Sequence, residues 1–142
     1  MTVKRSVSFV IRSRDEPERV LAVRRPPDDD DLPDAWGLPA ASLRAGESWP
    51  DAVRRAAREK LGVDVDVGAL LEEGELERTE YTLHMRLYEA RIRAGEPRVP
   101  QTTPGVTQYS ALDWAAAETF LPAAAEGSLC CRLWLRHVGR SH

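Results

Sequence analysis

The sequence predicts an α/β fold in which a mixed β-sheet is covered by helices on both faces. Three observations support this prediction. Apolar and polar residues alternate near the N-terminus and again in the middle of the chain, which is typical of half-buried strands. A segment with helical apolar spacing and clear capping residues lies between them, and a second such segment lies near the C-terminus. Each apolar stripe needs a partner layer, and a sheet between helices supplies one.

The length and charge of the chain limit its class. At 142 residues it is long enough for one domain with its own core, and we assign residues 1–142 to a single domain. Its 20 basic and 23 acidic residues give a formal net charge of −3, which argues against nucleic-acid binding through an overall basic field. No apolar run approaches the ~18 residues of a membrane span. Cys130 and Cys131 are adjacent and form no disulfide framework, so we expect a cytoplasmic protein.

The N-terminal part predicts two strands and a loop. Residues 3–12 mostly alternate, and after a turn at Asp15-Glu16-Pro17 the run Val20–Val23 predicts a returning strand, so the two form a hairpin. Residues 26–34 contain three prolines and five aspartates and predict a solvated loop. Four of those aspartates are consecutive, but they lack the spacing and the turn glycine of a calcium loop.

A helix follows the short apolar strand at Trp36–Pro39. Ser48 is the expected N-cap, with Pro50 and Asp51 in the first turn, and Gly62 ends the helix. Its apolar face is Ala52, Val53, Ala56, Ala57 and Leu61.

The remaining segments predict further strands and helices. Residues 63–67 and 80–92 alternate and predict strands, with Tyr81, Leu83, Met85 and Leu87 on one side of the second. Residues 95–105 form a proline-containing loop. An alanine-rich helical segment follows Trp114, and a last helix covers about residues 123–137.

The segment from Ala41 to Val63 resembles the Nudix box. The family pattern is G-x5-E-x7-R-E-U-x-E-E-x-G-U, where U is a bulky aliphatic residue. Five residues fall in register with it without a gap: Glu47, Arg55, Glu59, Gly62 and Val63. Trp36–Pro39 is similar to the family's W-x-x-P approach to the box, and the order of strands and helices also matches. The resemblance implies a Nudix-type (MutT-like) α/β/α sandwich with a mixed β-sheet.

The same resemblance implies a chemistry and a set of site residues. Family members cleave a diphosphate linked to another moiety X with Mg²⁺ or Mn²⁺, which orients water and neutralises phosphoryl charge. It implies Glu59 and Arg55 as catalytic residues, and Glu59 and Glu47 as metal ligands. Glu47 and Arg55 are alternatively a salt bridge that braces the loop against the helix. The implied partner is a nucleotide-type small molecule that binds beside Trp36. We expect no nucleic-acid or membrane partner. Family members commonly form dimers, so the resemblance also implies a homodimer.

The box is degenerate at its acidic positions. The three carboxylates of R-E-U-x-E-E correspond here to Ala56, Glu59 and Lys60. Residues at i, i+3 and i+4 share a helix face, so we expect that face to carry one negative and one positive charge. A lysine ~4–6 Å from a divalent cation opposes its binding by a few kcal/mol before screening. Gln108 stands where some members have a loop acid, and Ala40 and Ala41 replace the usual glycines.

Three functions remain open at this point. The first is a Nudix pyrophosphohydrolase of weakened or altered activity on a nucleoside-diphosphate-linked (NDP-X) or nucleotide ligand, with Mg²⁺ or Mn²⁺ as cofactor if it is active. The second is a non-catalytic nucleotide-binding module without cofactor, in which Lys60, Arg44 and Arg58 contact phosphates directly. The third is an interaction or structural role.

Overall fold

Two β-sheets with helices outside them make up the structure, a computed structural model that describes residues 2–101 and 108–140. The four-stranded sheet has the order β4 (Ala40–Ser42), β1 (Thr2–Val10), β6 (Tyr81–Ala94), β5 (Asp64–Glu77). Strands β1 and β6 are parallel and the other pairs are antiparallel, so the sheet is mixed. The three-stranded sheet has the order β3 (Trp36–Gly37), β2 (Val20–Arg24), β7 (Ala111–Ala115). The predicted α/β fold with a mixed sheet is confirmed.

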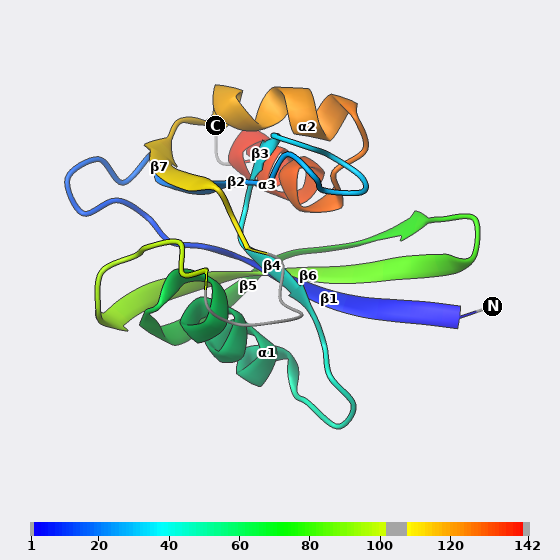
Figure 1. Cartoon of the computed structure of the whole chain (residues 1–142), viewed down its shortest axis with the longest axis horizontal. Helices are drawn as coiled ribbons and strands as arrows, with labels where there is room; N and C mark the ends of the chain where they lie inside the picture. The colour runs from blue at the N-terminus through cyan, green and yellow to red at the C-terminus, as the bar shows by residue number, and fades with distance from the viewer. Residues whose placement is uncertain (1, 102–107, 141–142) are drawn as a thin grey trace.

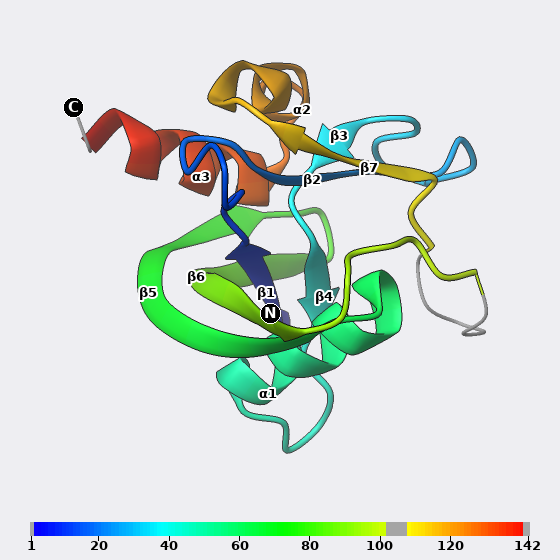
Figure 2. The same ribbon diagram turned by 90° about the vertical axis from the view of Figure 1, so that its left-hand side faces the viewer.

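The helices cover both faces of the four-stranded sheet (Figures 1 and 2). On one side lie α1 (Trp49–Ala56) and the π-helical turn η1 (Ala57–Leu61). On the other lie the 3-10 turn η2 (Ala117–Phe120), α2 (Leu121–Ala125) and α3 (Leu129–Arg140). Within the described residues no helix is long and apolar enough to cross a membrane.

Strand β1 shows why the sheet needs cover on both faces. Its last five residues, Ser6 to Val10, are all buried. Val7 and Phe9 belong to the core cluster beneath α1, whereas Val10 belongs to the cluster beneath α3. Strand β6 divides in the same way, and the predicted side with Met85 and Leu87 faces the α3 cluster. Because both pleat faces are apolar here, neither can be left in water.

Three sequence predictions about the elements were wrong in detail. The segment after β1 meets β2 through the bridge between Arg12 and Val20, but β1 and β2 lie in different sheets, so they do not form a simple hairpin. Strand β5 runs on to Glu77, because register shifts near Gly68 interrupt the alternation without ending the pairing. The last helix is two helices, α2 and α3, which Gly127 separates at φ 103°.

The box helix begins as predicted and changes type before its end. Ser48 is the N-cap, and its hydroxyl accepts a hydrogen bond from the backbone N–H of Asp51 at 3.2 Å. From Ala57 to Leu61 the helix widens into a π turn. Gly62 then ends it in the left-handed region at φ 68°. Side chains after Ala56 therefore do not follow α-helical spacing.

We expect Gly62→Ala to lower the free energy of unfolding by about 1–2 kcal/mol, because a Cβ disfavours the left-handed conformation. Urea unfolding of the purified protein measures this. Gly139→Ala is the matched control: its added Cβ meets nothing within 4 Å and it lies in α3, so stability stays equal or rises slightly. Equal losses in the two variants would contradict the role assigned to Gly62.

Candidate functional site

An arginine at the end of α1 holds the loop before the helix in place. The Nε atom of Arg55 donates to Glu47 Oε2 at 2.8 Å, and its Nη2 donates to Glu47 Oε1 at 3.0 Å and to the carbonyl oxygen of Ser42 at 2.7 Å. Both side chains of the ion pair are only 14% exposed. The backbone N–H of Arg44 also donates to Glu47. The predicted salt bridge between Glu47 and Arg55 is present, and it joins loop, β4 and helix.

Hydrogen bonds set the protonation of this pair. The hydrogen bonds from Arg55 hold the pKa of Glu47 below its ordinary value, although desolvation of the carboxylate acts to raise it. The hydrogen bond from the backbone N–H of Arg44 lowers the pKa further. Hydrogen bonding to Glu47 likewise raises the pKa of Arg55 above its usual value. Glu47 is therefore an ionised carboxylate that accepts three hydrogen bonds from the protein, from Arg55 and from the backbone of Arg44.

The surviving box acid is also engaged by arginines. Glu59 Oε1 accepts from Arg44 Nη2 at 3.1 Å, and its Oε2 accepts from Arg55 Nη1 at 3.4 Å. The side chain of Glu59 is 22% exposed. Among the described residues, the ion-pair partners of Glu59 are Arg44 and Arg55, and Lys60 is not one of them.

Lys60 is directed toward the start of β4 instead. Its Nζ donates to the carbonyl oxygen of Ala40 at 2.5 Å and lies 5.4 Å from the ring centroid of Tyr109. The Tyr109 hydroxyl accepts a hydrogen bond from the backbone N–H of Ala40 at 3.1 Å. An ammonium group is therefore fixed between strand β4 and the segment that leads into β7.

The first acidic position of the box points into the core. Ala56 is fully buried in the cluster that contains Val53 and Leu61. The π turn begins immediately after Ala56, and the two following box positions make different contacts: Glu59 meets Arg44 and Arg55, whereas Lys60 meets Ala40.

These side chains do not form a set of ligands suited to Mg²⁺ or Mn²⁺. Such hard cations take several oxygen ligands, chiefly carboxylates and water. Here Glu47 and Glu59 are held by arginines, Ala56 offers no oxygen, and Lys60 brings a positive charge. Within residues 2–101 and 108–140 no group of three His, Cys, Asp or Glu side chains is placed to hold a metal ion.

A small hollow adjoins Lys60 and brings together two of the expected ligand-binding residues. It has a volume of about 70 Å³, and Lys60 and Trp36 both line it. A neighbouring hollow of about 120 Å³ shares five lining residues with it: Arg25, Leu32, Ala40, Ser128 and Cys130. Arg44 lies at Glu59 rather than in these hollows, and exposed Arg58 lies 3.9 Å from Asp64, apart from the site.

Sequence reasoning missed Arg25, Tyr109 and Cys130 as lining residues. Arg25 is positioned by Asp29, whose Oδ2 accepts from Arg25 Nη1 at 3.0 Å and from the backbone N–H of Leu32 at 2.9 Å. The prediction of a wholly solvated aspartate loop was therefore wrong for Asp29, whose side chain is 12% exposed. The i, i+4 spacing of Arg25 and Asp29 was the available signal. No local pattern marks Tyr109 or Cys130 as lining residues.

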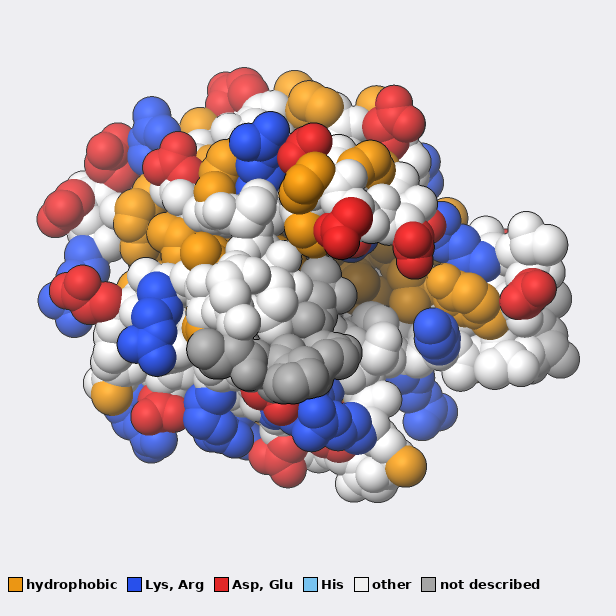
Figure 3. Space-filling model, viewed as in Figure 1, with side chains coloured by type: hydrophobic (Ala, Val, Ile, Leu, Met, Phe, Trp, Pro, Cys, Tyr) orange, Lys and Arg blue, Asp and Glu red, His pale blue; other side chains and the backbone are white. Residues whose placement is uncertain are grey.

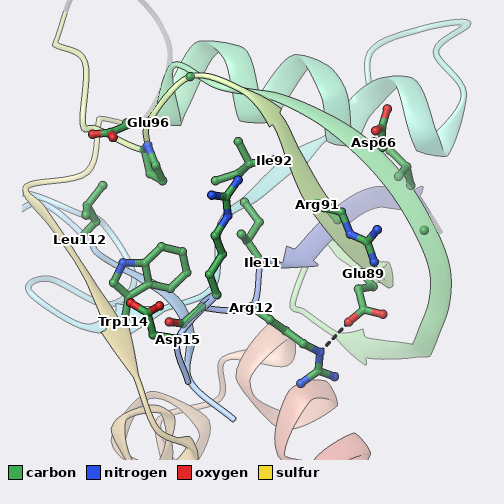
Figure 4. Close-up of a pocket in the computed structure, with 17 residues that line it drawn as sticks. Ile11, Arg12, Asp15, Asp66, Glu89, Arg91, Ile92, Glu96, Leu112 and Trp114 are labelled. Atoms are coloured by element: carbon green, nitrogen blue, oxygen red, sulfur yellow. Dashed lines mark hydrogen bonds and ion pairs between the residues drawn. The ribbon is translucent and has the colours of Figure 1, made fainter. Parts of the chain in front are cut away.

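Acidic and basic side chains are interspersed over the face in Figure 3, without a single-signed field. A hollow of about 1010 Å³ lies between the two sheets, and none of the box residues Glu47, Arg55, Glu59 and Lys60 lines it (Figure 4).

Comparisons with known proteins identify the family and the fold. A family model described as "NUDIX domain" matches residues 2–128. A MutT protein from Methanosarcina mazei Go1 is similar in structure, with a TM-score of 0.74 and 18% identity over 99% of this chain and 96% of that chain.

Two further solved structures are similar to this chain. They are a MutT NUDIX hydrolase from Burkholderia pseudomallei (TM-score 0.68, 24% identity, 83% of this chain and 86% of that chain) and an ADP-ribose pyrophosphatase from Streptococcus suis (TM-score 0.59, 17% identity, 81% and 75%). At these identities the likeness shows a shared fold. No curated protein matches the chain at the threshold of significance.

We expect Glu47→Gln to lower the free energy of unfolding at pH 7 by about 1–2 kcal/mol, because it removes a charge-assisted hydrogen-bonded pair. The pKa of Glu47 is lowered by folding, so its contribution is full above the unfolded-state pKa and is lost as pH falls through the folded-state value. The difference between wild type and variant should therefore shrink below about pH 4.5. Urea unfolding at several pH values measures it.

Glu16→Gln is the control for this measurement. It removes an ion pair with Arg19 whose side chains are 57% and 43% exposed, so we expect a change within about 0.5 kcal/mol. A pH-independent effect of Glu47→Gln would show that the carboxylate charge is not what stabilises the loop.

Proposed function

The chain belongs to the NUDIX domain family, and from this premise we propose that it acts on a nucleotide or NDP-X ligand with weakened or altered pyrophosphohydrolase activity. Two solved neighbours support the ligand class. One is described as an ADP-ribose pyrophosphatase and another as a UDP-X diphosphatase, and both names denote a nucleoside diphosphate joined to a further group. For this chain the class of ligand remains part of the proposal.

One observation carries the proposal of weak activity: the remaining box acid, Glu59, is paired with two arginines, and Lys60 stands where the box pattern has a second acid. The Lys60 ammonium binds the carbonyl oxygen of Ala40, and Arg44 and Arg55 bind both oxygens of Glu59. For a divalent cation to bind here, those ion pairs would have to break and a positive charge would have to move away. That reorganisation opposes metal binding at ordinary concentrations.

The same residues are suited to phosphate. Lys60 offers three N–H donors, of which Ala40 takes one, and Arg44 is 60% exposed with donors facing solvent. Lys60 shares its hollow with Arg25 and with Trp36, so a phosphate group at Lys60 would meet two cations and an aromatic wall. We propose Lys60 and Arg44 as the phosphate contacts and Trp36 as a contact of the rest of the ligand. Exposed Arg58, paired loosely with Asp64, lies apart from this arrangement.

A non-catalytic nucleotide-binding module is the second candidate. The observation that favours it is the reversal of charge at the box, from carboxylates to Lys60 and the arginines around Glu59. A site of this kind binds phosphate without a metal and leaves no free carboxylate to act as a base. Glu59 and Arg55 remain the proposed catalytic pair for the hydrolase, and a homodimer and a cytoplasmic location remain part of the same proposal.

We expect the wild type, with Mg²⁺ or Mn²⁺, to hydrolyse ADP-ribose and a UDP-sugar slowly or not at all. Lys60→Glu places a second carboxylate next to Glu59 and should raise the metal-dependent rate by about tenfold or more. Chromatographic assay of the mononucleotide product measures it. Lys60 is the residue to change because a charge at fully buried Ala56 would disrupt the core.

Arg58→Glu is the control, since it makes the same charge change at an exposed position outside the hollow. Robust wild-type turnover that Glu59→Gln abolishes would overturn the argument for a damaged site. Absence of turnover in wild type and in Lys60→Glu would favour the binding module.

We expect ADP-ribose to bind in the presence of EDTA, because the cations at the box replace the metal. Lys60→Met should weaken that binding by about tenfold, since a hydrogen bond to a charged group is lost. Isothermal titration calorimetry measures both affinities, with Arg58→Met as the control that leaves them unchanged. Binding that requires Mg²⁺ and is indifferent to Lys60→Met would contradict the role given to Lys60.

A further inference from the structure

The hollow between the two sheets is lined by none of the box residues Glu47, Arg55, Glu59 and Lys60, and we name it the inter-sheet hollow. It is bounded by the segment after β1, the paired ends of β5 and β6, and the inner side of β7 (Figure 4). Its lining comes from residues 11–15, 66–68, 89–92, 95–97, 112 and 114.

The volume of this hollow separates it from the hollows at Lys60. Its volume is about 1010 Å³, against about 70 and 120 Å³ for the two near Lys60. Pockets that bury small organic ligands usually measure ~300–1,000 Å³. Of these three hollows, only the inter-sheet hollow is large enough to enclose a whole nucleoside, so a nucleotide held at Lys60 would lie partly outside the hollow there.

Its interior is apolar and includes an aromatic platform. Ile11 is 2% exposed and Ala90 is 4% exposed, and both form part of the core beneath α1. Half-buried Ile92 and Leu112 continue this surface toward the half-buried indole of Trp114 (Figure 4). Trp114 is held in place because its residue pairs with Leu21 in the sheet and its carbonyl accepts from Arg19 at 3.3 Å.

Strand β5 bends around the hollow. Its pairing with β6 shifts register between Val67 and Leu70, at the residues that line the hollow. A Cβ at Gly68 would lie 3.3 Å from the carbonyl oxygen of Glu89, a tight approach that glycine avoids. Bulges of this kind curve a strand and are frequent beside binding and active sites.

Three arginines and four acidic residues line the hollow, and some of these side chains are paired. Arg12 pairs with Glu89 at 2.6 Å, and Asp66 pairs with Arg93 at 3.7 Å. Four other rim residues have no ion-pair or side-chain hydrogen-bond partner among residues 2–101 and 108–140: Arg14, Asp15, Arg91 and Glu96. Two guanidinium groups and two carboxylates provide donors and acceptors without a net charge. This favours an uncharged ligand with polar edges over a polyphosphate, which the cationic hollow at Lys60 suits better.

We propose that the inter-sheet hollow is a second ligand site, separate from the box, that takes a neutral heteroaromatic molecule of nucleoside size stacked on Trp114. The apolar floor removes the ring system from water, and the indole face supplies the stacking surface. The rim carboxylates accept hydrogen bonds from amino or hydroxyl groups, and the rim guanidinium groups donate to ring nitrogens or carbonyl oxygens. This proposal does not rest on the function proposed for the box, because no box residue lines the hollow.

Titration of the ¹⁵N-labelled full chain with adenosine tests the proposal without any variant. We expect saturable shifts at amides of residues 11–15, 66–68 and 89–92, with those of Ala40 and Lys60 unchanged. Shifts that centre on Ala40, Lys60 and Tyr109, or no saturable shift at millimolar adenosine, would overturn it. Tighter binding of AMP than of adenosine at the same amides would overturn the neutral ligand class.

Matched tryptophan variants give the second arm. Trp114→Ala should weaken adenosine binding about tenfold, and Trp114→Phe should retain most of it, because stacking needs an aromatic face. Trp49→Phe is the control: Trp49 packs partly buried against the same core cluster but does not line the hollow. Equal affinity in wild type and in folded Trp114→Ala would overturn the stacking role. ADP-ribose binding that depends on Lys60 is measured separately, so failure of either proposal is distinguishable from failure of the other.

Discussion

The guanidinium group of Arg55 is the contact on which the box depends. It binds two carboxylates and one backbone carbonyl, from Glu47, Glu59 and Ser42, and so joins the loop, the helix end and strand β4 in one arrangement. A planar group with five donors in fixed directions can do this, whereas the single ammonium of a lysine cannot. The geometry of a NUDIX domain can therefore persist around a box that has lost acidic residues, because the brace does not require a metal.

The loss of the acids changes what the site can bind more than how it folds. Ala56 fills a core position that a carboxylate would occupy only at the cost of burying charge. Lys60 gains a backbone carbonyl and the face of Tyr109, so its charge is accommodated. The scaffold thus exchanges an electronegative site for an electropositive one with few other changes. The proposal that this site binds phosphate directly, where an intact box would hold a metal, follows from this change of charge.

The fold could be predicted from the sequence because its main signals are local. Ser48, Gly62 and the box spacing mark the helix, and alternation marks β1 and β6. The second half of β5 gave no such signal: Glu72 is 6% exposed and its carboxylate pairs with Arg136 from α3, a contact 64 residues away. The contacts of the candidate site could not be predicted from the sequence for the same reason. The π turn, the Asp29 contact with Arg25 and the approach of Tyr109 to Lys60 all depend on tertiary packing, which periodicity cannot report.

The position of β1 inside the four-stranded sheet has a consequence for the order of folding. Its partner β6 is parallel and pairs with it at a constant separation of 79 residues, from Thr2 with Tyr81 to Val10 with Glu89. During synthesis, the apolar residues of β1 therefore emerge long before the strand that covers one of its edges. Until then only β4 and α1 are available as neighbours, and the exposed edge is open to other chains. We expect the slow step of folding to be the pairing of β1 with β6, which closes the long stretch of chain between them. Closing that loop lowers the entropy of the chain before the contacts between the two strands can stabilise it.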